Sequence, residues 1–94
     1  MCMIRSFRCR ETEMIHKGYS SPRFGAIQEQ ARKRLRWLDA ATTLTDLGAI
    51  RGNRLEALKG HRAGQYSIRV NDRWRICFTW RDGNAHSVEI VDYH

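Results

Sequence analysis

Alternation of apolar and polar side chains through the last thirty positions is the feature that most restricts how this chain can fold. Apolar residues occupy every second position in three short runs. These are Tyr66, Ile68 and Val70, then Trp74, Ile76, Phe78 and Trp80, and finally Val88 and Ile90. A period of two is typical of a strand that buries one face. The pattern therefore predicts three consecutive strands joined by short turns.

The first turn between these strands must keep the apolar residues on one face, because a slip of one residue turns a strand over. A loop of two residues after Val70 would place Ile68 opposite Arg75 and mix the faces. A loop of three residues, or a bulge near Arg73, instead pairs Ile68 with Ile76. The sequence therefore predicts the longer connection.

The second turn falls at 82–84, where Gly83 can supply the positive φ that short hairpin loops use. A loop of three residues here predicts that Phe78 lies opposite Val88 and that Ile76 lies opposite Ile90. The apolar face of the last strand then joins the apolar face of the strand before it.

On the other face of the predicted sheet, Arg69 lies opposite Arg75, and Arg73 lies opposite Tyr93. Like charges directly across a sheet are destabilising. We therefore expect that a partner outside the fold stabilises these arginines, and a polyanion is the simplest such partner.

Basic residues are concentrated in one part of the 94-residue chain, whose formal net charge is +7. Residues 51–81 hold eight Lys and Arg against two acidic residues, whereas residues 82–94 hold three acidic residues and no Lys or Arg. Such a distribution favours nucleic acid or another acidic partner.

Several classes of protein are excluded or disfavoured by composition. No apolar run reaches the roughly eighteen residues that a membrane span requires, so no membrane contact is expected. The three cysteines are odd in number and form no C-x-x-C pair, which favours reduced thiols in a cytoplasmic protein. His16, His61 and His86 lack ligand spacing with the cysteines, so no metal site is predicted.

The first half of the chain has helical rather than alternating spacing. Ser21 and Pro22 are typical of a helix start, as a serine cap and a proline in the first turn. Helical spacing of apolar residues then continues to about Ala41, at Phe24, Ile27, Ala31, Leu35 and Leu38. Shorter helical turns are expected at 11–16 and 44–50, and strands at 3–9 and 54–58.

The predicted order is thus a strand, then helices, then a meander of strands. Helices segregated from an antiparallel sheet define the α+β class. We expect one domain, residues 1–94, with the N-terminal strand and helices packed on one face of a mainly antiparallel sheet of four to five strands. The opposite face would carry the arginines.

Three segments, RLEALKG, GQYSIRVNDRWRICFTW and VEIVDYH, resemble the HigB-like toxins of the RelE/ParE superfamily. The similarity extends over nearly the whole chain, and SIRVN, WRI and a terminal DYH at this spacing form a specific set. The resemblance implies a RelE-like fold and a type II toxin. Such a toxin is an endoribonuclease that cleaves messenger RNA on the ribosome and so inhibits translation and growth. It also implies that no metal or organic cofactor is needed.

The resemblance further implies a set of partners. These are a HigA-type antitoxin with a helix-turn-helix domain, messenger RNA on the ribosome with contacts to ribosomal RNA, and operator DNA only through the antitoxin.

The functional positions of the family fall on Lys59, Arg75, Asp92, Tyr93 and His94. One segment departs from the family pattern, because several members have a histidine, in RLHPLKG-type segments, where this chain has Glu56. Ala57 replaces the proline that follows. Which residue accepts the proton is therefore left open.

The chemistry of RNA cleavage gives these residue types a role. Arg75 can present a planar fork to phosphate oxygens, and Lys59 a point charge. His94 can exchange protons near neutral pH, and Tyr93 can orient a nucleotide by stacking or hydrogen bonding. Glu56 is a candidate general base if it lies near Lys59 and the tail.

Other residues have supporting or structural interpretations. For Asp92, a structural role at the strand end is at least as well supported as direct chemistry. Trp74, Phe78 and Trp80 are expected to pack in the core rather than to stack on bases. Four arginines are candidate RNA contacts, namely Arg54, Arg62, Arg69 and Arg73.

Two alternative functions stay open from sequence. A ParE-like toxin would share the scaffold, act on DNA gyrase and cleave nothing. A non-catalytic basic RNA-binding module would fit the charge but would not explain the DYH tail.

Overall fold

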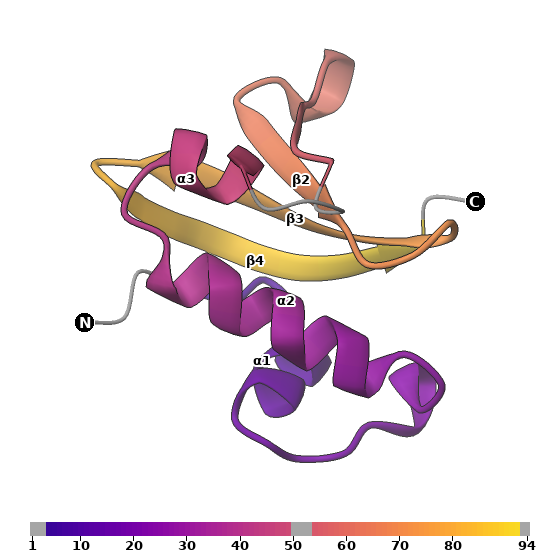
Figure 1. Ribbon diagram of the computed structural model, residues 1–94. Helices are drawn as coiled ribbons and strands as arrows, with labels where there is room; N and C mark the ends of the chain where they lie inside the picture. Colours follow the sequence, from indigo (N-terminus) through magenta and orange to yellow (C-terminus); the bar gives the residue numbers. More distant parts are fainter. Residues whose placement is uncertain (1–3, 50–53, 93–94) are drawn as a thin grey trace.

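The structure, a computed structural model, describes residues 4–49 and 54–92, with the backbone alone of Arg62. The elements in chain order are α1 (Arg10–His16), the 3₁₀ turn η1 (Pro22–Phe24), α2 (Gln28–Ala40), α3 (Leu44–Ala49), β1 (Glu56–Ala57), the 3₁₀ turn η2 (Gly60–Arg62), β2 (Gln65–Arg69), β3 (Trp74–Arg81) and β4 (Asn84–Asp92). Figure 1 shows α1 and α2 on the same side of the sheet.

The four strands form one antiparallel sheet in the order β1-β2-β3-β4. The N-terminal segment runs beside β4 in the parallel sense, through single bridges from Ile4 to Ala85 and from Phe7 to Val88. The predicted first strand is thus reduced, over the described residues, to two bridges at the β4 edge. The α+β class and the packing of helices against a mainly antiparallel sheet are confirmed.

The connection between β2 and β3 has the predicted register. Ile68 is the partner of Ile76, and the Val70 amide donates to the Trp74 carbonyl at 2.9 Å. The Asn71 side-chain oxygen accepts from the amides of Arg73 (2.9 Å) and Trp74 (2.8 Å). An asparagine that bonds the backbone two and three residues ahead stabilises this tight loop.

The connection between β3 and β4 differs from the prediction. Asp82 (φ 55°) and Gly83 (φ 77°) make a two-residue turn, and two positive φ angles are typical of the type I′ hairpin. This shorter turn shifts the register by one residue, and a bulge at Ser87 (φ 53°) restores it. Phe78, predicted to lie opposite Val88, therefore lies at the bulge.

A single cluster of buried apolar residues fills the space between the helices and the sheet. The predicted helical positions Phe24, Ile27, Ala31, Leu35 and Leu38 are all at most 7% exposed. They pack with the buried strand residues Ile68, Val70, Ile76, Phe78, Val88 and Ile90. Trp74 and Trp80 are partly buried against the same cluster, as expected. The helices therefore cover one face of the sheet.

The predicted long helix is interrupted after Phe24. The chain makes the 3₁₀ turn η1 first, and α2 begins only at Gln28. Ser21 does not cap a helix, because its hydroxyl donates to the Glu11 carboxylate at 2.6 Å, while the Gln28 side chain accepts from the Ser21 amide. The serine links η1 to α1 instead.

The contact between α1 and β4 includes a buried polar bond. Thr12 is fully buried, and its hydroxyl accepts from the Ile90 amide at 3.0 Å. Within the described ranges, no helix is both long enough and apolar enough to span a bilayer.

Candidate functional site

A row of polar side chains crosses the sheet on the face opposite the apolar core. Glu56, Ser67, Cys77 and Glu89 are successive partners across the four strands. They lie one residue out of phase with the buried apolar positions, so alternation directs them to the second face. The adjacent row contains Arg69 and Arg75, which are direct partners as predicted.

Arg75 is buried rather than open to solvent, with 8% of its surface exposed. Its Nε donates to the Ser67 hydroxyl at 2.8 Å. Its Nη2 donates to the Arg54 carbonyl at 2.6 Å and to the Ser67 carbonyl at 3.4 Å. A buried charge is tolerated only when it is hydrogen-bonded. These acceptors therefore fix the orientation of the guanidinium group.

The third nitrogen of that guanidinium group faces a carboxylate. Arg75 Nη1 lies 3.8 Å from Glu56 Oε1, and the Glu56 side chain is 57% exposed against 10% for Arg75. The pair thus joins an anchored cation to a carboxylate that solvent and ligands can reach. We call Glu56, Ser67 and Arg75 the Arg75 cluster.

Arg69 does not share the partners of Arg75. Its guanidinium group pairs with Asp72, which is almost fully exposed. The two neighbouring arginines are therefore held by different groups within the fold. The proximity of the two arginines therefore does not by itself require an outside polyanion, because internal acceptors and carboxylates stabilise both. Contact of these arginines with a polyanion stays a prediction.

Arg73 and Asp92 tie the β2–β3 loop to the end of β4. Both Nε and Nη2 of Arg73 lie 2.9 Å from Asp92 Oδ2. The hydrogen bond and the charge of Asp92 raise the pKa of Arg73 above its usual range. Tyr93 and His94, together with the predicted Arg73–Tyr93 pairing, lie outside the described residues. The tail follows Asp92, and the residue before Asp92, Val91, is the partner of Arg75 in the sheet.

Lys59 lies two residues beyond the end of β1. It is exposed and precedes η2, three residues beyond Glu56, which corresponds to about 10 Å of extended chain. Arg54 is also exposed and contributes its carbonyl to Arg75, from a backbone with φ 45°. The side chain of Arg62 lies outside the described residues. The described contacts thus join Glu56 and Arg75, but they do not bring Lys59 to them.

Two residues near the candidate site were not predicted. Ser67 is fully buried, and its hydroxyl and carbonyl oxygens both accept from Arg75. The alternation of β2 places Ser67 on the same face as Arg69, and this pattern could have indicated it from sequence. Arg34 of α2 has a lowered pKa because it is partly buried and close to the charge of Arg69. Helical spacing alone gives no such indication for Arg34.

The described residues contain no group of three or more His, Cys, Asp and Glu that could hold a metal ion. Neither Cys9 nor Cys77 forms a disulfide.

A comparison with protein families matches residues 11–94 to the RelE-like toxin of the type II toxin-antitoxin system HigB. The chain belongs to this family. As a HigB-like toxin it functions together with an antitoxin, and the matched range includes the WRI and DYH segments of this chain.

Curated relatives of this HigB-like toxin agree with the family assignment. The chain is 33% identical over 93 residues to Endoribonuclease HigB of Proteus vulgaris. This match covers 98% of this chain and 100% of the relative. It is 43% identical over 60 residues to Toxin HigB-1 of Vibrio cholerae serotype O1. This second match covers 64% of this chain and 63% of that relative.

The fold of the HigB-like toxin also resembles a solved structure. A chain of the YoeB-YefM complex from Staphylococcus aureus has a TM-score of 0.54 and 20% sequence identity, and the match covers 97% of both chains. At that identity the likeness describes the fold alone.

Proposed function

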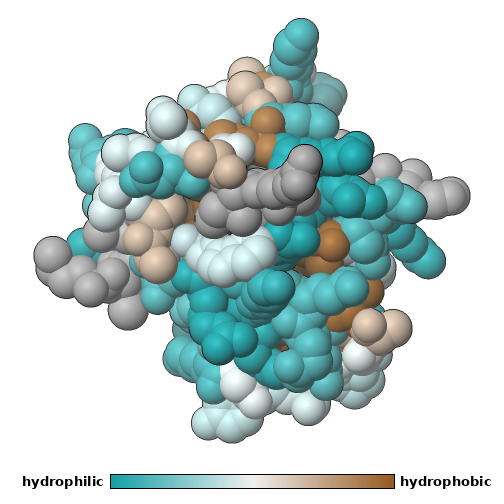
Figure 2. Space-filling view, in the orientation of Figure 1, coloured by the Kyte–Doolittle hydropathy of each residue, from teal (hydrophilic) through white to brown (hydrophobic). Residues whose placement is uncertain are grey.

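We propose that this protein is a ribosome-dependent messenger RNA endonuclease that needs no metal ion. Membership in the HigB-like toxin family and the near full-length match to a relative named as an endoribonuclease support cleavage. The largely hydrophilic face shown in Figure 2 and the net charge of +7 suit a polyanionic substrate.

The observation that carries the proposal is the Arg75 cluster. Glu56 accepts the proton of an RNA 2′-hydroxyl, whose oxygen then attacks the adjacent phosphorus and breaks the bond to the 5′-oxygen. Arg75, oriented by Ser67, stabilises the charge that develops on the phosphate oxygens. Fixed donors of this kind are usually the largest single contribution to catalysis, and a positioned base contributes about 10²–10⁴-fold.

The remaining family positions complete the proposed site. His94 donates a proton to the leaving 5′-oxygen, and Tyr93 orients the nucleotide. Lys59 contributes positive charge further along the RNA strand. Asp92 fixes the start of the tail through Arg73, as their 2.9 Å contacts suggest.

The proposed biological setting follows the family. The toxin acts in the cytoplasm on translated messenger RNA and contacts ribosomal RNA. A HigA-type antitoxin with a helix-turn-helix domain neutralises it, and operator DNA is bound only through that antitoxin.

Primer extension on a reporter messenger RNA tests the activity, in a purified translation system with and without ribosomes. Wild-type protein is expected to cut within translated codons only when ribosomes are present. Glu56→Gln is expected to reduce cleavage by roughly 10²-fold or more, because the substitution removes a base while preserving shape.

Glu29→Gln is the matched control, since Glu29 is an exposed α2 carboxylate with a side chain 80% exposed. Cleavage equal to wild type in both variants would exclude Glu56 as the base. A wild-type protein that leaves RNA intact but alters DNA supercoiling would instead support a gyrase toxin.

A further inference from the structure

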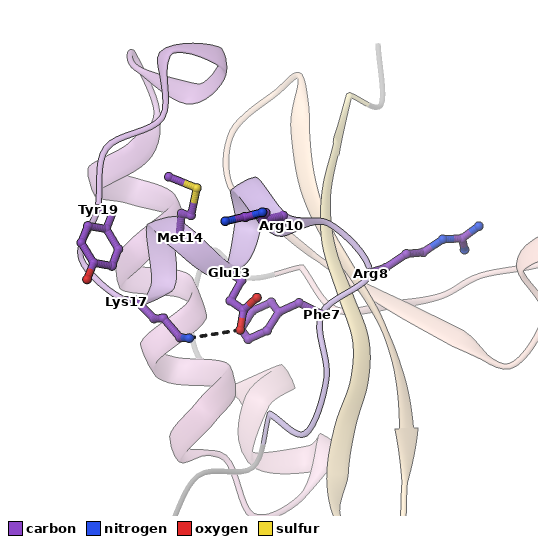
Figure 3. Close-up of a pocket in the computed structure, with 7 residues that line it drawn as sticks. All are labelled: Phe7, Arg8, Arg10, Glu13, Met14, Lys17 and Tyr19. Atoms are coloured by element: carbon purple, nitrogen blue, oxygen red, sulfur yellow. Dashed lines mark ion pairs between the residues drawn. The ribbon is translucent and has the colours of Figure 1, made fainter.

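An open groove of about 630 Å³ lies between the N-terminal segment and α1. Figure 3 shows the side chains that line it, which come from the segment before α1, from α1 itself and from the residues after it. None of them belongs to the Arg75 cluster. We call this depression the Met14 groove.

Apolar side chains form much of the groove. Phe7 and Met14 are half-buried, and Tyr19 is 61% exposed. Among the described residues, Tyr19 is the only large hydrophobic side chain in the exposed class. An exposed aromatic side chain beside a flexible thioether is typical of a surface that receives an apolar side chain from a partner.

The charged residues of the groove are mostly basic. Lys17 lies 3.2 Å from the Glu13 carboxylate, as the dashed line in Figure 3 marks, and Arg8 lies 3.7 Å from Glu89. Arg10 is exposed and makes no ion pair within the described part of the chain. Arg8 points away from the other lining residues in Figure 3, so two cations, Arg10 and Lys17, stand against the single carboxylate of Glu13.

The groove and the Arg75 cluster are at different places on the sheet. The N-terminal segment and α1 border β4, where Thr12 bonds the Ile90 amide. Glu56 belongs to β1, the strand at the other edge of the order β1-β2-β3-β4. A partner seated in the groove would consequently not need to contact Glu56.

We propose that the Met14 groove binds an acidic segment of the antitoxin that inserts one apolar side chain between Met14 and Tyr19. The proposal depends on membership in a toxin-antitoxin family and not on RNA cleavage. The excess of cations complements acidic residues on either side of the inserted group. The apolar surface formed by Phe7, Met14 and Tyr19 favours a protein over a nucleic acid, because a protein segment can insert an apolar side chain there.

Titration calorimetry between the purified toxin and its cognate antitoxin tests the proposal. Arg10→Glu reverses the charge of the unpaired cation, and Met14→Asp places a charge where the apolar group would insert. Each is expected to weaken the affinity at least tenfold. Arg10 is the first residue of α1, so a glutamate there suits the helix dipole and should not impair folding.

Arg36→Glu is the matched control, because Arg36 is exposed on α2 and does not line the groove. It should bind the antitoxin as wild type does. RNA cleavage, measured in parallel, is expected to be unchanged in all three variants.

Antitoxin affinity within twofold of wild type for both Arg10→Glu and Met14→Asp would overturn the proposal. Unchanged antitoxin affinity with impaired cleavage would assign the groove to RNA instead. If the wild-type toxin cleaves no RNA, the calorimetric result still decides the docking site, so the two proposals fail separately.

Discussion

At the scale of single residues, the candidate site depends on how a buried arginine is held. Arg75 retains 8% exposure, and Ser67 supplies both a hydroxyl and a carbonyl to its guanidinium group. Glu56 approaches from the solvent side at 3.8 Å. We therefore propose that Ser67 is a positioning residue, because its two hydrogen bonds constrain which nitrogen of Arg75 faces Glu56.

Ser67→Ala removes the acceptor of Arg75 Nε. Leaving that buried donor without its partner is expected to cost about 1–3 kcal/mol in the free energy of unfolding, measured by urea denaturation. We expect kcat for RNA cleavage to fall at least tenfold with a smaller change in KM, because orientation rather than substrate affinity is lost.

Ser67→Thr keeps the hydroxyl and serves as the matched variant. It should restore more of kcat than Ser67→Ala does. If both variants unfold at wild-type urea concentrations and retain wild-type kcat, the positioning role of Ser67 is wrong.

At the scale of elements, the β3–β4 hairpin illustrates what the sequence predicts and what it does not. Alternation predicted the pairing of Ile76 with Ile90, which is confirmed. It did not predict the bulge at Ser87. A two-residue turn followed by a bulge and a three-residue turn without one both place Ile76 opposite Ile90, so alternation cannot distinguish them. Turn residues alone do not distinguish these solutions.

The turn itself gives a test. Gly83 has φ +77°, and a Cβ there would meet no atom within 4 Å, so the cost of Gly83→Ala comes from the backbone alone. We expect a loss of about 1–2 kcal/mol in the free energy of unfolding, measured by thermal and urea denaturation.

Gly25→Ala is the control for that experiment. Gly25 has φ −47°, and an added Cβ would meet only the Pro22 carbonyl at an ordinary 3.7 Å. The same substitution should therefore be neutral or stabilise by about 0.4–1 kcal/mol. Equal destabilisation at both glycines would contradict the assignment of strain to Gly83.

The contact of α1 with the sheet provides a second test at this scale. Thr12→Val keeps the side-chain shape but removes the acceptor of the Ile90 amide. We expect a loss of about 1–3 kcal/mol in unfolding free energy and faster hydrogen exchange at the Ile90 amide. Wild-type exchange at that amide would show that the bond does not hold α1 to β4.

At the scale of the whole molecule, the order of elements and the core were largely predictable, and the partners of the charged residues were not. Periodicity identifies buried apolar positions such as Ile68 and Leu35 because burial repeats along a strand or helix. It contains no information on which carboxylate an arginine reaches. The pairing of Arg69 with Asp72 and the burial of Arg75 therefore emerged only in three dimensions.

The net charge of +7 leads to the last prediction, on the binding of single-stranded RNA. Arg69 and Arg73 lie near the end of the sheet where β4 leads into the tail, and each pairs with one carboxylate. RNA phosphates can bind beside these carboxylates, since a guanidinium group has five N–H donors. Binding then releases counterions, so affinity should fall as salt rises.

Replacing Arg69 and Arg73 together by glutamine should reduce the slope of log affinity against log salt by about 1.4, at about 0.7 per phosphate contact on a single strand. The control replaces Arg36 and Arg81, which are exposed on α2 and at the other end of β3, and changes the net charge equally. Fluorescence anisotropy with a short RNA gives both slopes. An equal reduction in the two variants would mean that RNA senses only total charge, whereas a reduction confined to Arg69 and Arg73 places phosphates beside the tail.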